Sequence, residues 1–415
     1  MEKSDWMQVY QISDHFAMHW YGTDFALHNI SRSRGIIRCN SVEACVIMAI
    51  NEYHRLDKVW EKVACDSGID IFYQPAVNSF INYVQKLKSK CIIVEGNSTK
   101  QVFGIKNKLF PLFASVELTN RCNFHCSHCY KEANTIQGTF LSLENAKKLA
   151  STIVPHLYSI DITGGEATLH PEFSKIIDLF HVPVLNLITN GFNIDAIDDE
   201  TLKRFSQIQV SLYGYSDDMY LHSTGCNAFQ TVCKALERIR DLGIYTTVAV
   251  ILKQGSMEEI EKYFELLDKL RIYNLRFGLA LKIGRNKNGV AEWDVSEEKR
   301  SLFYQKIVEL SSLYSYFDVG NIESHSIDLA DQPSDKEYSI VCGAGESNIC
   351  ISEKGLVRPC VMFPEEYFGI YSIDKYFSSI EKGESISYKS CLSRCSKKLK
   401  EEGRCILDLC PHGIG

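Results

Sequence analysis

The sequence predicts an α/β protein in which a partial (β/α)6 barrel lies between a small N-terminal helical module and a cysteine-rich C-terminal tail. The barrel is predicted because strand-like and helix-like segments alternate six times between about residues 110 and 325. Such an alternation requires parallel strands joined by helical crossovers. Six units are too few for a closed eight-stranded barrel, so we expect an open, three-quarter barrel.

The six predicted strands are short apolar segments, and amphipathic segments separate them. The strands are FASVEL (113–118), YSIDIT (158–163), VLNLIT (184–189), IQVSLY (208–213), YTTVAVIL (245–252) and LRFGLAL (275–281). The intervening helices are SLENAKKLASTIV (142–154), HPEFSKIIDLF (170–180), AFQTVCKALERIRDLG (228–243) and SMEEIEKYFELLDKLR (256–271).

Residues 1–100 predict a winged-helix-like domain. The pattern is, in order, a hairpin at 25–40, helices at 41–54, 56–68 and 75–90, and a strand at 91–95. Asn40 is the expected cap of the first helix, with Glu43 in its first turn, and Pro75 opens the third. This module contains 11 Lys plus Arg and 11 Asp plus Glu. Because it has no net positive charge, DNA binding is not expected.

Two further segments complete the organisation. The polar, glycine-containing segment 96–108 predicts a linker between the module and the barrel. From about 335 to 415 the predicted helices are short and the cysteines dense. A segment with so few large apolar residues needs another source of stability, and a bound metal can provide it.

The bulk properties indicate a cytoplasmic protein. The 415-residue chain has a net charge of −7, which disfavours binding to nucleic acid or to an anionic membrane. It has no apolar run of membrane-spanning length, and its first residues do not resemble a signal peptide. Sixteen cysteines in a reducing compartment indicate metal or redox chemistry. Six scattered ones are interpreted as small buried hydrophobes: Cys39, Cys45, Cys65, Cys91, Cys226 and Cys233.

Polar motifs follow the first four predicted barrel strands. Cys122, Cys126 and Cys129 come after the first, the segment 163–167 (TGGEA) after the second, and the segment 189–191 (TNG) at the end of the third. The fourth strand ends near a serine. Because the C-terminal ends of parallel strands share one face of such a fold, these motifs are expected to converge there.

The three cysteines have the spacing Cys-x3-Cys-x2-Cys. Structural zinc requires a closed set of four ligands, and His125 or His128 could be the fourth. However, His128 directly precedes Cys129, which makes tetrahedral closure by both awkward. Three thiolates without a fourth suit a [4Fe–4S] cluster with one open iron.

With the aromatic residue that follows it, the motif CNFHCSHCY resembles the signature of radical S-adenosylmethionine (SAM) enzymes. The resemblance implies that Cys122, Cys126 and Cys129 hold a [4Fe–4S] cluster whose open iron is chelated by SAM. It also implies a 5′-deoxyadenosyl radical that abstracts hydrogen from a substrate, a reductant such as flavodoxin or ferredoxin, and the three-quarter barrel as the fold.

The same resemblance implies a set of SAM contacts. Tyr130 would lie against the adenine, and Glu166 would pair with the ammonium group. At the position of Thr224 many relatives have an arginine that grips the carboxylate, which leaves Arg285 as another candidate for that role. The implied contacts are Tyr130, Gly164, Gly165, Glu166, Asn190, Ser211 and Thr224.

The tail resembles the SPASM extension, which binds auxiliary iron–sulfur clusters. Cys342, Gly355 and Cys360 fit its first half, whereas the later spacing is looser than usual. The implied ligands are Cys342, Cys350, Cys360, Cys391, Cys395, Cys405 and Cys410. Two complete [4Fe–4S] clusters need eight ligands, so one cluster has an open site, a non-cysteine ligand contributes, or only one cluster binds. Alternatively, Cys350 points into a core.

The N-terminal module is similar to the peptide-recognition element of enzymes that modify ribosomally synthesised peptides (RiPPs), where a leader peptide adds a strand to a sheet edge. The resemblance therefore implies a maturase acting on a precursor peptide, most commonly by forming a thioether. Carbon–carbon cross-linking, epimerisation and sulfatase-maturase-like side-chain oxidation remain alternatives. A non-enzymatic iron–sulfur carrier or zinc scaffold would leave the motifs after the second, third and fourth strands unexplained.

Overall fold

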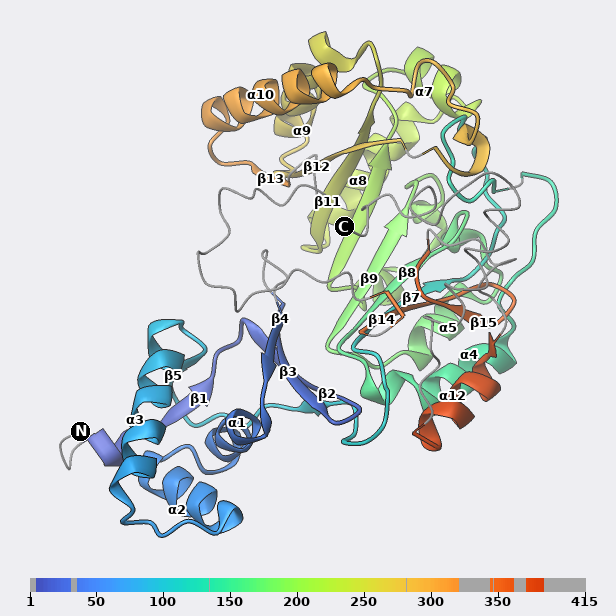
Figure 1. The fold of residues 1–415 in the computed structure, drawn as a ribbon. Helices are drawn as coiled ribbons and strands as arrows, with labels where there is room; N and C mark the ends of the chain where they lie inside the picture. Colours follow the sequence, from blue (N-terminus) through green and yellow to red (C-terminus); the bar gives the residue numbers. More distant parts are fainter. Residues whose placement is uncertain are drawn as a thin grey trace. The chain divides into compact units, whose positions relative to one another are not determined.

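The computed structural model describes residues 5–30, 36–133, 135–280, 282–320, 344–345, 347–361 and 371–383 (Figure 1). Its contacts divide the chain into two compact units. The first extends to Leu112 and includes residues 380–383, and the second begins at Phe113. Within the described residues, no helix combines the length and apolar character that crossing a membrane requires.

The first unit packs three helices against two small sheets. Its strands are β1 (Tyr10–Ile12), β2 (Phe16–Tyr21), β3 (Asp24–Asn29), β4 (Ile36–Cys39), β5 (Ile93–Glu95) and β6 (Val102–Phe103). Its helices are η1 (Asp5–Met7), α1 (Ser41–Tyr53), α2 (Leu56–Ser67) and α3 (Gln74–Ser89). The sheet order is β4-β3-β2-β6, and β1 pairs with β5. Apolar side chains of all three long helices form one core with these strands.

The expected helix boundaries of this unit are confirmed. Asn40 caps α1 by accepting hydrogen bonds from Val42 N and Glu43 N, and the Glu43 side chain accepts one from Asn40 N. This reciprocal arrangement satisfies amide groups that the first helical turn would leave unpaired. Gly68 ends α2 in the left-handed conformation, with φ of 64°. The hairpin predicted at 25–40 is present as β3 and β4. The expectation that Cys65 and Cys91 are buried is wrong, because both are exposed at helix ends.

The linker predicted at 96–108 is partly wrong. β6 lies inside it and pairs in parallel with β2, as Met18 opposite Val102 shows. The first unit therefore continues past the expected boundary at residue 100. A strand of two residues has no periodicity that a sequence pattern could reveal, because its partner lies far away along the chain.

The second unit contains the six predicted parallel strands. They are β7 (Phe113–Glu117), β8 (Ser159–Thr163), β9 (Val184–Thr189), β10 (Gln207–Leu212), β11 (Tyr245–Leu252) and β12 (Asn274–Leu279). Each pairs in parallel with the next along the chain. A short strand β13 (Asp318–Gly320) follows β12 at one edge, so the described sheet is open, as expected.

Helices separate these strands, and four lie where the sequence predicts them: α4 (Leu143–Thr152), α5 (Phe173–Leu179), α8 (Phe229–Asp241) and α9 (Ile260–Lys269). Three further helices were not among those predicted: α6 (Asp199–Leu202), α7 (Asp217–Thr224) and α10 (Glu297–Leu313). Five short 3-10 turns complete the described connections: η2 (Val154–His156), η3 (Ala167–Leu169), η4 (Ile194–Ala196), η5 (Ser256–Glu258) and η6 (Gly284–Asn286).

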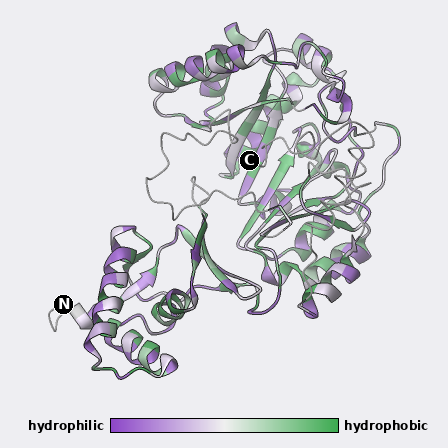
Figure 2. Cartoon of the chain, viewed as in Figure 1, coloured by the Kyte–Doolittle hydropathy of each residue, from purple (hydrophilic) through white to green (hydrophobic). Residues whose placement is uncertain are grey.

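The two faces of the parallel sheet differ in chemistry. Ile160, Leu187 and Val210 are fully buried and alternate with partly exposed polar residues such as Asp161 and Ser211. Figure 2 shows hydrophobic residues concentrated on these strands and hydrophilic residues on the outer helices. Since side chains of a strand alternate between faces, one face is an apolar core and the other is available to polar ligands.

The tail extends the same sheet beyond β7. β14 (Asn348–Ile351) pairs in parallel with β7, and β15 (Leu356–Arg358) returns antiparallel to it. β16 (Tyr371–Ser372) and α12 (Ile373–Glu381) follow. We call residues 348–358 the tail hairpin. Its pairing with β7 was not predicted. Five expected cluster ligands lie outside the described residues: Cys342, Cys391, Cys395, Cys405 and Cys410.

Candidate functional site

The three-cysteine loop, residues 120–131, follows the C-terminal end of β7. Cys122 and Cys126 are buried, and Cys129 is partly buried. Burial raises the pKa of the Cys122 and Cys126 thiols to about 12. Three neighbouring thiols that are buried or partly buried suit a metal centre, because a bound metal would stabilise their thiolate forms.

No three His, Cys, Asp or Glu side chains of the described residues converge closely enough to bind one metal ion. In an iron–sulfur cluster each thiolate instead binds a different iron. His128, an alternative zinc ligand, packs its ring 4.2 Å from the Trp293 ring, and its Nδ1 is buried without a hydrogen-bond partner. Burial lowers the pKa of His128 to about 4.

The segment after β12 holds this loop in place. The Arg285 guanidinium donates to the Cys126 carbonyl at 2.7 Å and to the Ala133 carbonyl at 2.8 Å. Its backbone N–H donates to the Cys129 carbonyl at 3.0 Å. Arg285 is therefore a positioning residue for the loop in this structure, rather than a free cation for the SAM carboxylate. The Trp293 indole adds a hydrogen bond of 2.8 Å to Ser127 Oγ.

The glycines after β8 bring a second backbone segment against the loop. Gly165 N donates to Thr119 O at 2.6 Å, and Glu166 N donates to Arg121 O at 2.8 Å. A Cβ atom on Gly165 would lie 2.3 Å from Arg121 O, and one on Gly164 would lie 2.4 Å from Thr119 O. Only glycine permits this approach, so the two glycines form a turn directly beside the three-cysteine loop.

Glu166 connects this turn to the end of β9. Its carboxylate is 1% exposed and accepts hydrogen bonds of 2.7 Å each from Thr168 Oγ1, Thr189 Oγ1 and Asn190 N. Burial raises the pKa of Glu166, while these donors oppose that shift. The carboxylate thus orders the two strand ends, and its contact with the SAM ammonium remains a prediction.

Asn190 reaches the three-cysteine loop directly. Its Nδ2 donates to Asn123 Oδ1 at 2.7 Å and lies 3.7 Å from Cys122 Sγ. Ser211 lies on the partly exposed polar face of β10, opposite Ala249 of β11. Tyr130, at the end of the motif, is partly buried. The structure therefore brings the loop, the glycine turn and Asn190 together at one end of the sheet, as the sequence predicts.

Thr224 joins this group through its backbone. Its side chain is 1% exposed and donates to Tyr220 O at 2.7 Å within α7. Its carbonyl accepts a hydrogen bond of 2.8 Å from His125 N of the three-cysteine loop. Thr224 therefore helps to hold the loop, and a contact between its hydroxyl and the SAM carboxylate remains a prediction.

The described tail contains two of the expected auxiliary ligands. Cys350 is fully buried on β14, and Arg358 Nε donates to its sulfur at 3.4 Å. Burial raises the pKa of the Cys350 thiol to about 12. This surrounding favours packing over cluster ligation for Cys350. Cys360 is partly buried and lies two residues beyond β15.

Sequence reasoning missed four charged residues that surround the ends of the three-cysteine loop: Glu117, Lys131, Glu353 and Arg358. The available signal was Glu117, a carboxylate within the largely apolar segment FASVEL. A charge in such a position requires a buried partner. The partner on β15 could not be identified, because the sequence does not reveal that the tail hairpin joins the sheet.

The segment that contains most of these residues matches a known protein family. Residues 116–267 match the model of the Radical SAM superfamily. The matched stretch contains the three cysteines, the glycine turn, Asn190 and Ser211. The chain therefore carries a radical SAM domain, which confirms the resemblance found in the sequence.

Two relatives come from Bacillus subtilis (strain 168). The antilisterial bacteriocin subtilosin biosynthesis protein AlbA is 27% identical over 304 residues, which cover 69% of this chain and 64% of AlbA. The sporulation killing factor maturation protein SkfB is 24% identical over 205 residues, which cover 48% of this chain and 50% of SkfB. The chain thus spans between half and just under two thirds of the length of these relatives.

Among solved structures, Streptococcus suis SuiB bound to precursor peptide SuiA matches with a TM-score of 0.61. The match covers 92% of this chain and 90% of SuiB at 13% identity. At that identity the similarity shows a common fold. It agrees with an α/β architecture built on a central parallel sheet.

Proposed function

We propose that this chain, in which residues 116–267 form a radical SAM domain, is a maturase that modifies a ribosomally synthesised precursor peptide. The observation that carries the proposal is the meeting of three elements at one end of the sheet. These are the three-cysteine loop, the glycine turn at 164–165 and Asn190.

Cys122, Cys126 and Cys129 would hold a [4Fe–4S] cluster, and the adjoining glycine turn would let SAM approach the backbone. When bound, the cluster and SAM supply a 5′-deoxyadenosyl radical that abstracts hydrogen. The chain's own residues fix the loop from three directions: Arg285 binds its carbonyls, Thr224 binds His125 N, and Asn190 lies against Cys122.

The simplest test is anaerobic reconstitution followed by incubation with SAM and a reductant. We expect about 12 irons per chain if two auxiliary clusters bind and about 8 if one binds, since each cluster contains four irons. We also expect 5′-deoxyadenosine to form. Tightly held zinc with almost no iron would contradict the proposal, and so would iron without SAM cleavage.

A thioether between a cysteine sulfur and a carbon of the peptide is the proposed product. The names of AlbA and SkfB associate those proteins with a bacteriocin and a killing factor, which supports a peptide substrate here. Thioether formation breaks one C–H and one S–H bond and forms one C–S bond. The hydrogen atom from carbon would pass to the 5′-deoxyadenosyl radical, the thiol proton would be released to solvent, and the one remaining electron would be accepted by an auxiliary cluster. A product two hydrogens lighter with a thiol that no longer alkylates supports the thioether. An unchanged mass indicates epimerisation, and a lighter product whose thiols still alkylate indicates carbon–carbon cross-linking or side-chain oxidation.

The leader of the precursor would dock on the first unit. β4 is the end strand of its sheet in the described residues, so an extended peptide could pair with it. Beside β4 and α1 lies a cavity of about 410 Å³, lined by residues that include Phe25, Cys39 and Met48. A side chain of the docked strand would fill this cavity, which gives the edge a means of selecting its peptide.

Cys39→Trp fills that cavity and is expected to weaken leader binding about tenfold or more, because a bound side chain loses its pocket. SAM cleavage without peptide should be unchanged. Fluorescence anisotropy of a labelled precursor measures the binding. Cys65→Trp is the matched control, because Cys65 is exposed on α2 and outside the cavity lining. Equal affinity of both variants and the wild type would argue against docking at β4.

A further inference from the structure

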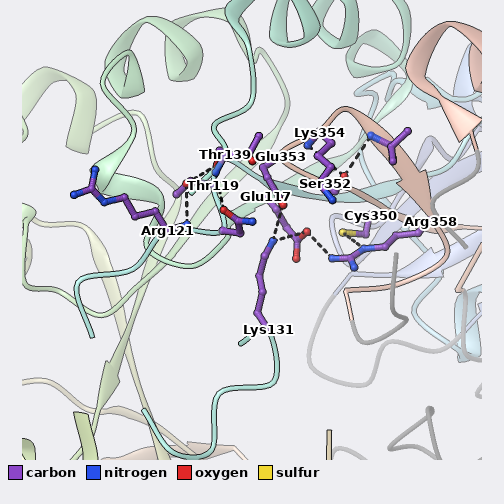
Figure 3. A network of polar contacts seen from close by, with 12 residues as sticks. Glu117, Thr119, Arg121, Lys131, Thr139, Cys350, Ser352, Glu353, Lys354 and Arg358 are labelled. Atoms are coloured by element: carbon purple, nitrogen blue, oxygen red, sulfur yellow. Dashed lines mark hydrogen bonds and ion pairs between the residues drawn. The ribbon is translucent and has the colours of Figure 1, made fainter. Parts of the chain in front are cut away.

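Four charged side chains and one thiol form a buried group between the three-cysteine loop and the tail hairpin (Figure 3). We call it the Glu117 network. Its members are Glu117, Lys131, Cys350, Glu353 and Arg358. The Glu117 side chain has no exposed area, and the Arg358 side chain is 8% exposed. Charges removed from water to this degree interact strongly and are screened little by salt.

One carboxylate oxygen is the centre of the network. Glu117 Oε2 lies 2.7 Å from Lys131 Nζ and also accepts a hydrogen bond from Arg358. Lys131 Nζ reaches Glu353 Oε2 at 3.0 Å. Among the described members of the network, two carboxylates therefore balance two cations. Removing any one of them leaves the buried group with a net charge.

Three members of the network lie near the ends of the three-cysteine loop and of the tail hairpin. Glu117 is the last residue of β7, where the three-cysteine loop begins, and Lys131 directly follows Tyr130 where the loop ends. Arg358 ends β15, two residues before the expected auxiliary ligand Cys360. The same ion pairs thus connect both ends of the loop to the strand that leads to the tail cluster site.

One atom of the network has no partner. Glu117 Oε1 is buried and accepts no hydrogen bond in the described structure. Buried carboxylate oxygens are normally satisfied, so an open one is unusual in a purely structural ion pair. The open oxygen belongs to the same carboxylate that Lys131 contacts at the end of the three-cysteine loop.

We propose that Glu117, Lys131 and Arg358 are positioning residues that couple the tail site at Cys360 to the three-cysteine site. They hold both ends of the three-cysteine loop against the tail hairpin. Their charges also determine the electrostatic potential at the group that the loop binds. The inference rests on the proposed role of Cys122, Cys126 and Cys129 as cluster ligands. It makes the order of the tail a condition for full activity at the SAM site.

The charge balance provides a test that distinguishes an electrostatic role of these residues from a role in packing alone. Glu117→Gln leaves an excess positive charge near the loop, which favours the reduced cluster and shifts its reduction potential upward. Arg358→Gln leaves an excess negative charge and shifts the potential downward. Loss of either contact should also lower SAM cleavage about 10- to 100-fold, as for other outer-shell partners of metal ligands.

The measurement is a redox titration followed by electron paramagnetic resonance, using the signal that changes when SAM is added. Glu144→Gln is the control, because that side chain is 79% exposed and pairs with Lys148 on the surface. It should leave the potential unchanged. If Arg358→Gln does not fold, Lys131→Gln tests the same downward shift.

Opposite shifts for Glu117→Gln and Arg358→Gln, or for Glu117→Gln and Lys131→Gln, support the coupling. Shifts of the same sign, or no shift, overturn it even if cleavage falls. A wild-type protein without any SAM-sensitive cluster signal would instead contradict the proposed function on which the inference rests.

Discussion

Cys126→Ala is expected to abolish SAM cleavage. Cys126 is buried at the centre of the three-cysteine loop, where Arg285 fixes its carbonyl group. Alanine leaves two thiolates for a proposed cluster that needs three. The loss should exceed the 10- to 100-fold that follows removal of an outer-shell partner, about 100-fold or more. Chromatography of 5′-deoxyadenosine measures it.

Two cysteine variants make this result specific. Cys395→Ala should retain some SAM cleavage and lose the peptide product, since it removes an expected tail ligand and leaves the three-cysteine loop intact. Cys65→Ala changes an exposed thiol of the first unit and should behave as the wild type. SAM cleavage by the Cys126 variant at the wild-type rate would show that the cluster assignment is wrong.

Gly165→Ala is expected to weaken SAM binding as strongly as loss of a ligand contact. The added methyl group would lie 2.3 Å from Arg121 O and 2.7 Å from Arg121 C, so either the glycine turn or the three-cysteine loop must move. Overpacking against backbone costs about 1–3 kcal/mol, and here that cost falls on the turn proposed to hold SAM. Isothermal titration of the reconstituted protein with SAM should show an affinity lower by about 10-fold or more.

Gly255→Ala is the matched control for this substitution. No heavy atom lies within 4 Å of a Cβ atom at Gly255, and its φ is −91°. The alanine should therefore fit without strain, and SAM affinity should stay at the wild-type value. If Gly165→Ala binds SAM as well as Gly255→Ala does, the glycine turn is not part of the SAM site.

The barrel could be predicted from the sequence because its signals are local. The strands from β7 to β12 are short, largely apolar segments, amphipathic helices follow four of them, and polar motifs lie at the ends of the first four. Asn40 and Gly68 likewise mark helix ends through side-chain and backbone preferences that act within one turn. In these cases the residues that determine the structure are neighbours along the chain.

The remaining features depend on pairings between distant residues. The sequence gives no indication that β6 joins β2, or that Arg358 would meet Glu117, because neither partner carries a signal of the other's position. The role of Arg285 illustrates the same difficulty at the site. Its place after the sixth strand was correctly recognised, whereas its carbonyl partners on the loop depend on how the chain folds back.

The pairing of β14 with β7 has a consequence for biosynthesis. Phe113 opens the first barrel strand, and its partner Asn348 is made only when most of the chain has left the ribosome. Until then one side of β7 is an unpaired strand edge, which can pair wrongly with other chains. Contacts so distant along the chain also form slowly, since a large loop must close first. The N-terminal half of the site is therefore synthesised early but completed late, and production of active protein depends on how well the nascent chain is protected in the interval.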